Sequence, residues 1–346
     1  MTSKLEAWLA RLSDPSGPNP QWSPAPFSDT ELALLPKILD AAGRHNIRPG
    51  LVRNLGLQLR MAPEAFVSGE PARSRTVIDA LMARANDLRL QDVARAVLLS
   101  NAAREILTDV AESALPVVLI KGVDLAESAY GGLHARTFSD IDLLVRPQAE
   151  EALGQILASH GFTAHLPSKK RVEHTERQWT RTDAHGGVIL VEVHTDLVHA
   201  PELRARQTLT YDLYAAPAAG GATPAAKLVL CALHGATSHL FGRLQYVVDG
   251  LMVARSGVDP TELRQRTLRS GALLPVATML RLAHRLYGCE PSHALLGALG
   301  PVPWAGLEQL MITPAMVLSA KSTHRWRLLP QRYMYRRLLR MTGKPA

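Results

Sequence analysis

The 346-residue sequence has little cysteine, few aromatic residues and no long apolar run. Two cysteines, Cys231 and Cys289, are too few for a disulfide scaffold or a cysteine-built zinc or iron–sulfur site, so we interpret them as small core residues. No apolar stretch approaches the roughly 18–20 residues that a membrane-spanning helix needs. Lys4, Glu6 and Arg11 interrupt the N-terminus, which therefore lacks the apolar centre of a signal peptide. We expect a soluble protein of a reducing cytoplasm.

Several catalytic motifs are absent as well. The sequence has no Gly-x-Ser-x-Gly, no Walker-type phosphate loop and no Gly-x-Gly-x-x-Gly. These absences argue against a serine hydrolase, a P-loop NTPase and a dinucleotide-dependent dehydrogenase. Apolar residues make up 47% of the chain and charged residues 20%, which is a globular composition. The length predicts two or three domains or subdomains.

The net charge of +8 is concentrated near the C-terminus. Residues 321–346 hold no acidic residue, but three aromatic residues stand among eight basic ones: Lys321, Arg325, Trp326, Arg327, Arg332, Tyr333, Tyr335, Arg336, Arg337, Arg340 and Lys344. This basic tail fits a clamp on a nucleic-acid backbone, or contact with an acidic partner or a membrane surface. It also fits a solvated, frayed helix that aids solubility. The tail indicates an anionic partner without identifying it.

Hydrophobic periodicity divides the rest of the chain into three parts. Residues 1–114 are predicted to form an N-terminal helical domain that contains a long helical region from about residue 73, of one helix or two. Residues 115–200 are predicted to form a small sheet unit. Residues 201–320 return to helical spacing and form a C-terminal lobe. We therefore expect an α+β fold, in which a small mixed β-sheet with helices is flanked by N-terminal and C-terminal helical regions.

The middle part alternates between short strands and helices. Four segments with strand patterns are separated by two helical ones, and glycine pairs mark the turns. We expect strands at 116–120, 141–145, 175–182 and 188–194, and helices at 123–130 and 147–160. In the C-terminal lobe we expect helices at 228–240, 244–255, 260–270, 272–287 and 292–299.

Two acidic residues on the second predicted strand carry the first chemical signal. Alternation along a strand places Asp140 and Asp142 on one face, with Ile141 and Leu143 buried behind them. Carboxylates held this close repel one another unless a cation compensates, and Mg²⁺ is often bound through one or two carboxylates and substrate phosphates. An Asp-x-Asp at a strand edge also occurs in proteins without a metal, so further residues must support the hypothesis.

A third carboxylate has a similar setting. Glu192 lies between Val191 and Val193, whose side chains are expected to face the core. If its strand lies beside that of Asp140 and Asp142, three acids can hold two metal ions, Mg²⁺ or Mn²⁺, for an in-line displacement at phosphorus. His194, on the same face as Glu192 by our prediction, lines the site or orients a carboxylate.

Lys121 and Gly122 stand where the first predicted strand gives way to a helix. Backbone N–H groups and the helix dipole favour a phosphate there, and Lys121 adds positive charge. Arg136, four residues before Asp140, can meet a phosphate or pair with the acids. A helix-capping glycine and a surface salt bridge are the alternatives.

The remaining histidines give no recognisable zinc motif: His160, His165, His194 and His199. His234 and His239 are close in sequence. Their i, i+5 spacing is poor for two ligands on one α-helical face, where i, i+4 serves. We expect a packing or hydrogen-bonding role for them.

The ordered set of Lys121-Gly122, Arg136 and Ser139-Asp140-Ile141-Asp142-Leu143 resembles the uncharacterised nucleotidyltransferase family. That family belongs to the DNA polymerase β-type nucleotidyltransferase superfamily, and the layout is similar to bacterial nucleotidyltransferase-type toxins. The resemblance covers about residues 115–289, and later features agree with it: Val191-Glu192-Val193-His194, His234-Gly235-Ala236, Arg243 and Asp249.

The resemblance implies a metal-dependent transfer of a nucleoside monophosphate from an NTP such as ATP, with release of pyrophosphate. The acceptor, a hydroxyl or phosphate of a small molecule, peptide or RNA, is not identified. The resemblance assigns catalysis and metal binding to Asp140, Asp142 and Glu192, and nucleotide binding to Lys121, Gly122, Arg136, Ser139, Lys227 and Arg243. One departure is that Val123, and not serine or glycine, follows Gly122.

Two alternatives stay open. The basic tail can dock RNA, which would make the protein a toxin-like modifier of tRNA or another RNA. The protein can also be a non-catalytic nucleotide-binding adaptor of a biosynthetic cluster. The presence of all three acids argues against the adaptor hypothesis, because an inactive site does not need three carboxylates that repel one another.

Overall fold

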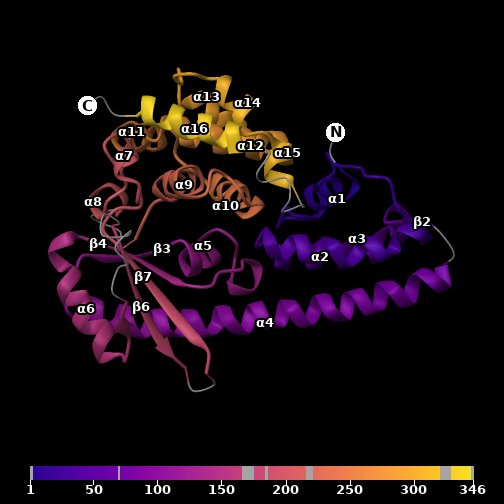
Figure 1. The fold of residues 1–346 in the computed structure, drawn as a ribbon, viewed down its shortest axis with the longest axis horizontal. Helices are drawn as coiled ribbons and strands as arrows, with labels where there is room; N and C mark the ends of the chain where they lie inside the picture. The colour runs from indigo at the N-terminus through magenta and orange to yellow at the C-terminus, as the bar shows by residue number, and fades with distance from the viewer. Residues whose placement is uncertain are drawn as a thin grey trace.

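The computed structural model describes residues 3–68, 71–165, 175–183, 186–215, 221–319 and 329–343. Within these ranges most residues are helical, and the strands form a five-stranded mixed sheet and a short parallel pair. The predicted α+β fold is confirmed. Figure 1 shows the layers, with α4 along one side, the sheet next to it, and the C-terminal helices on the far side of the sheet.

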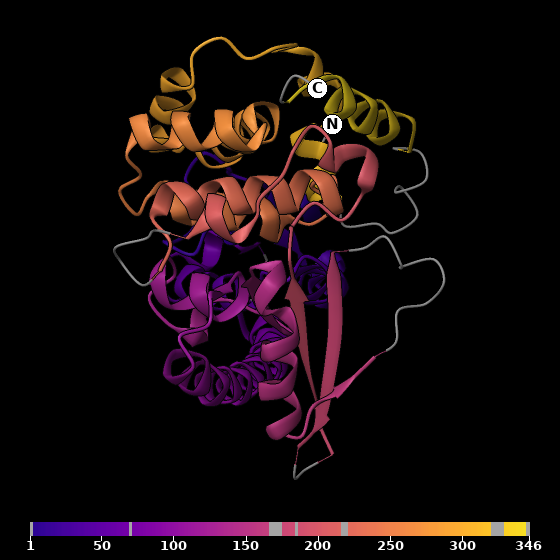
Figure 2. The ribbon, with the colours of Figure 1, turned by 90° about the vertical axis from the view of Figure 1, so that its left-hand side faces the viewer.

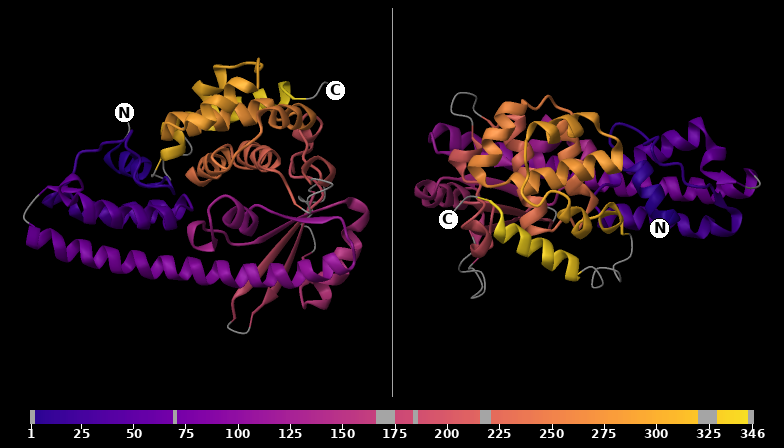
Figure 3. Two further views of the ribbon diagram at one scale, coloured as in Figure 1. Left: turned by 180° about the vertical axis from the view of Figure 1, so that it is seen from behind. Right: turned by 90° about the horizontal axis from the view of Figure 1, so that it is seen from above.

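The N-terminal part consists of helices and one strand pair: α1 (Lys4–Leu12), β1 (Phe27–Ser28), α2 (Leu35–Arg44), α3 (Arg48–Met61), β2 (Val67–Ser68) and α4 (Pro71–Glu112). The long helical region is therefore one helix of 42 residues. After Pro71 its sequence has neither proline nor glycine, so nothing in it interrupts the backbone hydrogen bonds. At 1.5 Å per residue it is about 63 Å long. It extends under both the N-terminal helices and the sheet (Figure 3).

The five-stranded sheet has the order β3-β4-β7-β6-β5. β4 and β7 are parallel, and the other neighbours are antiparallel. Its strands and the helices between them are β3 (Val117–Ile120), α5 (Gly122–Ser128), β4 (Ile141–Val145), α6 (Glu150–Ser159), β5 (Thr163–Ala164), β6 (Glu176–Thr182) and β7 (Val188–His194). The four predicted strands and two predicted helices are present, and β5 is an additional short strand. The long strands β6 and β7 extend past the body of the molecule in Figure 2.

The two faces of the sheet have different surroundings because side chains alternate along each strand. Ile141, Leu143, Val191 and Val193 are buried in a cluster with α4 and α6, as predicted. Leu144 faces the other way and joins a cluster with the C-terminal helices. Asp142 has the same parity as Leu144, so the acidic side of β4 points toward those helices.

The C-terminal part is helical: α7 (Pro201–Arg204), α8 (Tyr211–Tyr214), α9 (Pro224–Leu233), α10 (Leu244–Ala254), α11 (Pro260–Ser270), α12 (Leu273–Tyr287), α13 (Glu290–Ala298), α14 (Leu307–Met311), α15 (Pro314–Leu318) and α16 (Leu329–Met341). Thr223 caps α9 through a hydrogen bond from the backbone of Ala226. A π-helix, η5 (His234–Ser238), follows α9 directly. Cys231 and Cys289 are free and buried, as predicted.

One apolar cluster joins segments that are far apart in sequence. Trp8 and Leu51 of the N-terminal helices belong to the same buried cluster as Leu230, Leu280 and Tyr335 of the C-terminal helices. The division at residues 114, 200 and 320 remains a prediction. Among the described residues, none of the helices combines the length and apolar character needed to cross a membrane.

Part of the predicted basic tail is α16. Its Tyr335 and Leu339 are fully buried, and Arg336 and Arg340 both pair with Glu202, at 2.8 and 2.9 Å. This helix is thus packed on the C-terminal lobe and is not a frayed end. Five further basic or aromatic residues of the segment lie outside the described residues: Lys321, Arg325, Trp326, Arg327 and Lys344.

Candidate functional site

The register of β4 and β7 brings the predicted acids together. Asp142 is the direct partner of Glu192 across the parallel pair, and Leu144 is the partner of His194. On the other side of β4, Asp142 is opposite Ile120 of β3. The ligand atoms of Asp142, Glu192 and His194 lie within 4.8 Å of one another. The prediction that the Glu192 strand lies beside the Asp142 strand is confirmed.

Asp142 is buried between two nitrogen groups. Lys121 Nζ donates a hydrogen bond to Asp142 Oδ1 at 2.7 Å, and His194 Nε2 lies 2.9 Å from the same oxygen. Burial by itself raises a carboxyl pKa, but the charge of Lys121 and the hydrogen bond from His194 hold the pKa of Asp142 well below its usual range. His194 thus contacts a carboxylate, and its role in orienting Asp142 stays a prediction.

The pKa values of Asp140 and Glu192 are raised, in contrast to that of Asp142. Burial and then the charge of Asp142 raise the pKa of Asp140 to about 6, and the same two causes raise the pKa of Glu192 to about 7. Glu192 Oε1 accepts a hydrogen bond from Gln178 Nε2 at 3.0 Å. The raised pKa values of these two groups reflect burial first, and then an excess of negative charge around Asp142. An oxygen donor set with this excess fits a divalent cation such as Mg²⁺ or Mn²⁺.

The turn between β3 and α5 is strained and tightly packed. Lys121 has φ 54° and ψ −117°, a conformation that L residues adopt rarely. A Cβ on Gly122 would lie 3.2 Å from the Phe138 ring and 3.3 Å from the backbone oxygen of Asp140. The absence of a side chain at residue 122 therefore lets the turn pack against the segment that carries Asp140.

A pocket of about 340 Å³ opens at this face of the sheet. Its walls come from the turn after β3, the segment before β4, strands β6 and β7, and the helices η5 and α10. Eight of the nine predicted site residues line it: Lys121, Gly122, Arg136, Ser139, Asp140, Asp142, Glu192 and Arg243.

Arg136 is held in place by Asp249 of α10. Its Nε and Nη2 donate to the two carboxylate oxygens of Asp249 at 2.8 Å each, and the Tyr130 hydroxyl donates to the same carboxylate at 2.6 Å. Burial opposes the charged form, but Asp249 raises the pKa of Arg136 above its ordinary value. Arg136 therefore presents a fixed, permanently charged guanidinium at the pocket wall.

Lys227 is not among the residues that line this pocket. Its Nζ donates to Asp124 Oδ1 at 2.6 Å and to Ser128 Oγ at 2.8 Å, both in α5. The contact joins α9 to α5. A nucleotide contact of Lys227 stays a prediction that its position does not support.

His234 and His239 approach each other despite their i, i+5 spacing. Their ring centroids are 4.7 Å apart, because η5 is a π-helix whose hydrogen bonds connect residues five apart. The spacing argument assumed an α-helix and does not hold for this segment, but the expected packing role of both rings is confirmed. Both residues line the pocket, and the His239 ring stacks on Tyr246 with centroids 4.5 Å apart.

Other pocket residues had no signal in the sequence. They come from loops, from β6 and from the first turn of α10, whose positions around the pocket no local pattern reveals: Asn46, Glu176, Gln178, His199, Gln245 and Tyr246. Alternation along the predicted strand at 175–182 places Glu176 and Gln178 on one face, and this was the available hint.

Comparison with known families gives a match over most of the chain. The model of the family described as uncharacterised nucleotidyltransferase matches residues 37–288. The matched range begins in α2, ends after α12 and includes every residue that lines the pocket. A search of the curated proteins finds no match.

Proposed function

Because the chain belongs to the uncharacterised nucleotidyltransferase family, we propose that it transfers a nucleoside monophosphate from an NTP to an acceptor and releases pyrophosphate. The acceptor atom is a hydroxyl or phosphate oxygen. The observation that carries the proposal is the register of β4 and β7, which supports a catalytic group of Asp142 and Glu192 with Asp140 immediately before β4. The basic residues Lys121, Arg136 and Arg243 also line the pocket beside this group.

The carboxylates of Asp140, Asp142 and Glu192 would hold the metal. When bound, Mg²⁺ or Mn²⁺ neutralises triphosphate charge and stabilises the leaving pyrophosphate. Asp142 is ionised at neutral pH in this environment, which suits a metal ligand. The raised pKa values of Asp140 and Glu192 indicate carboxylates that gain most from a nearby cation.

The transfer step needs a base and a fixed phosphate. The acceptor oxygen attacks the α-phosphorus, the bond from that phosphorus to the bridging oxygen breaks, and pyrophosphate leaves. Glu192 would bind the metal on the acceptor side and help to remove the proton of the acceptor hydroxyl. Lys121, Arg136 and Arg243 would bind triphosphate oxygens, with Gly122 and Ser139 leaving room for them. When a nucleotide binds, Lys121 would break its ion pair with Asp142 and pair with a phosphate oxygen instead.

The base of the nucleotide has a matching surface on η5 and α10. The His239 ring stacks on Tyr246 at an interplanar angle of 10°. Burial and the charge of Arg243 lower the pKa of His239 to about 4, so the ring is neutral at pH 7. A neutral aromatic face at the pocket suits stacking with a purine or pyrimidine.

The test is transfer of label from α-labelled NTPs, measured together with pyrophosphate release, on small-molecule, peptide and RNA acceptors. Asp142→Asn keeps the size of the side chain and removes its charge. We expect it to fold and to lose about 1000-fold or more in turnover, since metal-bound charge is worth several kcal/mol.

The matched control is Asp212→Asn. Asp212 is an exposed aspartate that pairs with Arg146 away from the pocket, so this variant is expected to keep wild-type turnover. Turnover by Asp142→Asn at the wild-type rate would contradict the proposal.

The RNA-modifying alternative depends on the basic tail. Truncation of the tail would remove the buried Tyr335 and with it part of the core packing, so lost RNA binding would not be distinguishable from lost stability. Arg337 is exposed on α16, so its substitution avoids this problem. If this surface binds RNA, Arg337→Gln is expected to weaken RNA binding and reduce its salt dependence. Unchanged RNA affinity would argue against this role for α16.

A further inference from the structure

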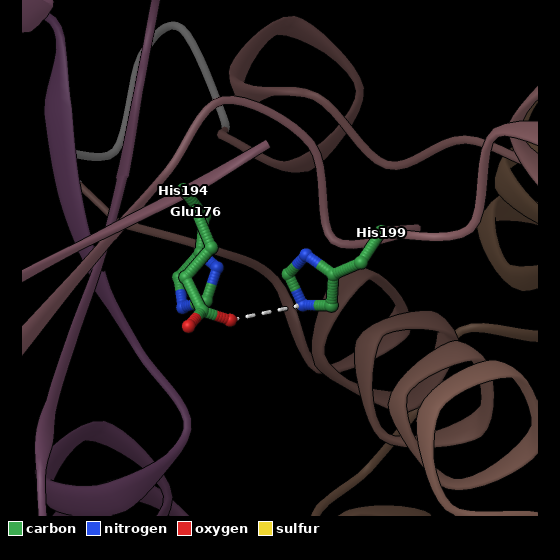
Figure 4. A group of neighbouring side chains, drawn as sticks. All are labelled: Glu176, His194 and His199. Carbon is green, nitrogen blue, oxygen red and sulfur yellow. Dashed lines mark ion pairs between the residues drawn. The ribbon is translucent and has the colours of Figure 1, made fainter. Parts of the chain in front are cut away.

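A second group of possible metal ligands lies beside the three acids. Glu176 of β6, His194 of β7 and His199 of the following loop each offer one ligand atom, and these atoms lie within 4.8 Å of one another. Glu176 and His194 are direct partners across the antiparallel pair of β6 and β7. Figure 4 shows the three side chains converging from the sheet and the loop.

His194 contributes a buried nitrogen that lacks a partner. The residue is fully buried, and among the described residues nothing forms a hydrogen bond with its Nδ1. Its Nε2 lies 2.9 Å from the carboxylate of Asp142, so Nε2 carries the proton and Nδ1 holds a lone pair. A histidine that donates one N–H to a carboxylate and keeps the other nitrogen for a metal is the usual arrangement in metal sites.

Thr175 sets the state of His199 in the same way. The Thr175 hydroxyl donates to the backbone oxygen of Asp196 at 2.6 Å, so toward His199 Nδ1, at 3.3 Å, it can only accept. Nδ1 therefore carries a proton. In the neutral ring the lone pair is then on Nε2, which lies 3.5 Å from Oε2 of Glu176.

The distance of 3.5 Å between His199 and Glu176 is longer than the 2.7–2.9 Å of a charge-assisted hydrogen bond. It is close to the separation of about 3.4 Å between two ligand atoms of a tetrahedral zinc ion with bonds of about 2.1 Å. His199 and Glu176 form an ion pair when the imidazole is protonated, and a metal cation between the two atoms can take the place of that proton.

We propose that Glu176, His194 and His199 bind one zinc-class transition-metal dication. Two imidazole nitrogens and one carboxylate select zinc and its neighbours over Mg²⁺, which prefers oxygen ligands. Three protein ligands leave a fourth position open, and Glu176 and His199 line the nucleotide pocket. The ion therefore lies next to the three acids, with Asp142 as the outer partner of its ligand His194. This site does not depend on the proposed nucleotidyl transfer.

The test uses the full chain without nucleotide. Chelator-stripped protein is titrated with Zn²⁺ in competition with a chromogenic chelator, and Co²⁺ serves as a spectroscopic probe of tetrahedral geometry. We expect one ion per chain, unaffected by millimolar Mg²⁺. Glu176→Gln and His199→Ala are expected to weaken binding by more than about 100-fold, beyond the loss typical of outer partners.

Two control variants test whether the bound Zn²⁺ occupies this site and not a surface histidine or the three acids. His165→Ala removes an exposed histidine that bonds to Thr180 outside the cluster, and is expected to leave Zn²⁺ affinity unchanged. Asp140→Asn is expected to keep Zn²⁺ while losing Mg²⁺-dependent nucleotide binding. Circular dichroism checks the fold of each variant.

Three results would overturn the proposal. They are absence of Zn²⁺ binding by the wild type, binding that neither Glu176→Gln nor His199→Ala weakens, and binding that Asp140→Asn removes. The first of these would leave a protonated His199 paired with Glu176.

Discussion

At the residue scale, Lys121 combines a strained backbone with a buried charge. Its φ of 54° costs an L residue on the order of 1–3 kcal/mol. Its ammonium is buried, and the pairing with Asp142 more than offsets the desolvation that would lower the pKa of Lys121. When no metal is bound, the ammonium of Lys121 thus supplies the positive charge that compensates the three carboxylates.

Lys121→Met tests this role, because it keeps the length of the side chain and removes the charge. Breaking a buried ion pair typically costs about 3–5 kcal/mol of unfolding free energy, so Tm in chelator should fall clearly. Mg²⁺ or Mn²⁺ is expected to restore much of the loss, since the three acids then depend on the metal. Thermal unfolding with and without metal measures this.

The control for this prediction is Lys227→Met. It removes a comparable ammonium, which pairs with Asp124 outside the pocket. The control should lose stability without recovery by metal. An equal metal response in the two variants would contradict the role of Lys121.

A prediction about Gly122 concerns the position of the neighbouring segment that carries Asp140. In Gly122→Ala the new Cβ meets the Phe138 ring and the backbone oxygen of Asp140, so the segment before β4 must move by a few tenths of an ångström. We expect about 10- to 100-fold less transfer, because small displacements of reacting groups are costly. Unfolding free energy should fall by about 1–3 kcal/mol.

Gly297→Ala is the matched control for Gly122→Ala. Gly297 lies in α13, where nothing is within 4 Å of an added Cβ. The control should be neutral or slightly stabilising. Full activity of Gly122→Ala would show that the turn does not position Asp140.

The sequence was informative about single residues where an alternating pattern applied. Strand alternation correctly predicted the side chains of β4 and β7 that pack into the core below the sheet, and Asp142 lies beside Glu192 as expected. It did not reveal that Lys121 pairs with Asp142, because the pair depends on the unusual backbone of residue 121. Helical spacing predicted a packing role for His234 and His239 correctly, but it did not reveal the π-helix that brings the two rings together.

At the scale of elements, the strands and most helices follow from local patterns, and their pairing does not. Nothing local specifies that β4 is parallel to β7, since the two strands are separated by α6, β5 and β6. The small strands β1, β2 and β5 have two residues each and carry no periodic signal. Hydrophobic periodicity alone does not distinguish the single 42-residue helix α4 from two helices in series.

The docking of α16 gives a prediction about pH. Burial opposes ionisation, but hydrogen bonds from Arg340 and Arg336 lower the pKa of Glu202 to about 2. A depressed carboxyl pKa adds stability above the unfolded value of about 4.3, and this part is lost as pH falls from about 4.3 toward 2. The groups are partly exposed, so the contribution is no more than about 1 kcal/mol.

Glu202→Gln is the variant that measures this contribution. The Tm difference between wild type and Glu202→Gln is expected to be largest near pH 7 and low salt, and to shrink below about pH 4.3 and in high salt. A difference that is constant from pH 7 to pH 3 would show that the charge of Glu202 does not hold α16.

At the scale of the whole molecule, the pocket lies where two buried clusters meet. One cluster joins the sheet to α4 and α6, and the other joins the N-terminal and C-terminal helices. α4 belongs to both, through Leu81 in one and Leu99 in the other. The sequence predicted the order of helical, mixed and helical parts, but which helices share a core depends on contacts between residues hundreds of positions apart.

The most direct test of the proposed site is calorimetric titration of each NTP, with and without Mg²⁺, into wild type and the double variant Asp140→Asn/Asp142→Asn. We predict that the wild type binds one nucleotide only with the metal, and that the double variant, still folded, does not bind it. Metal-dependent binding by the double variant at wild-type affinity would contradict the assignment of the site. Absence of binding by the wild type would contradict the proposed function.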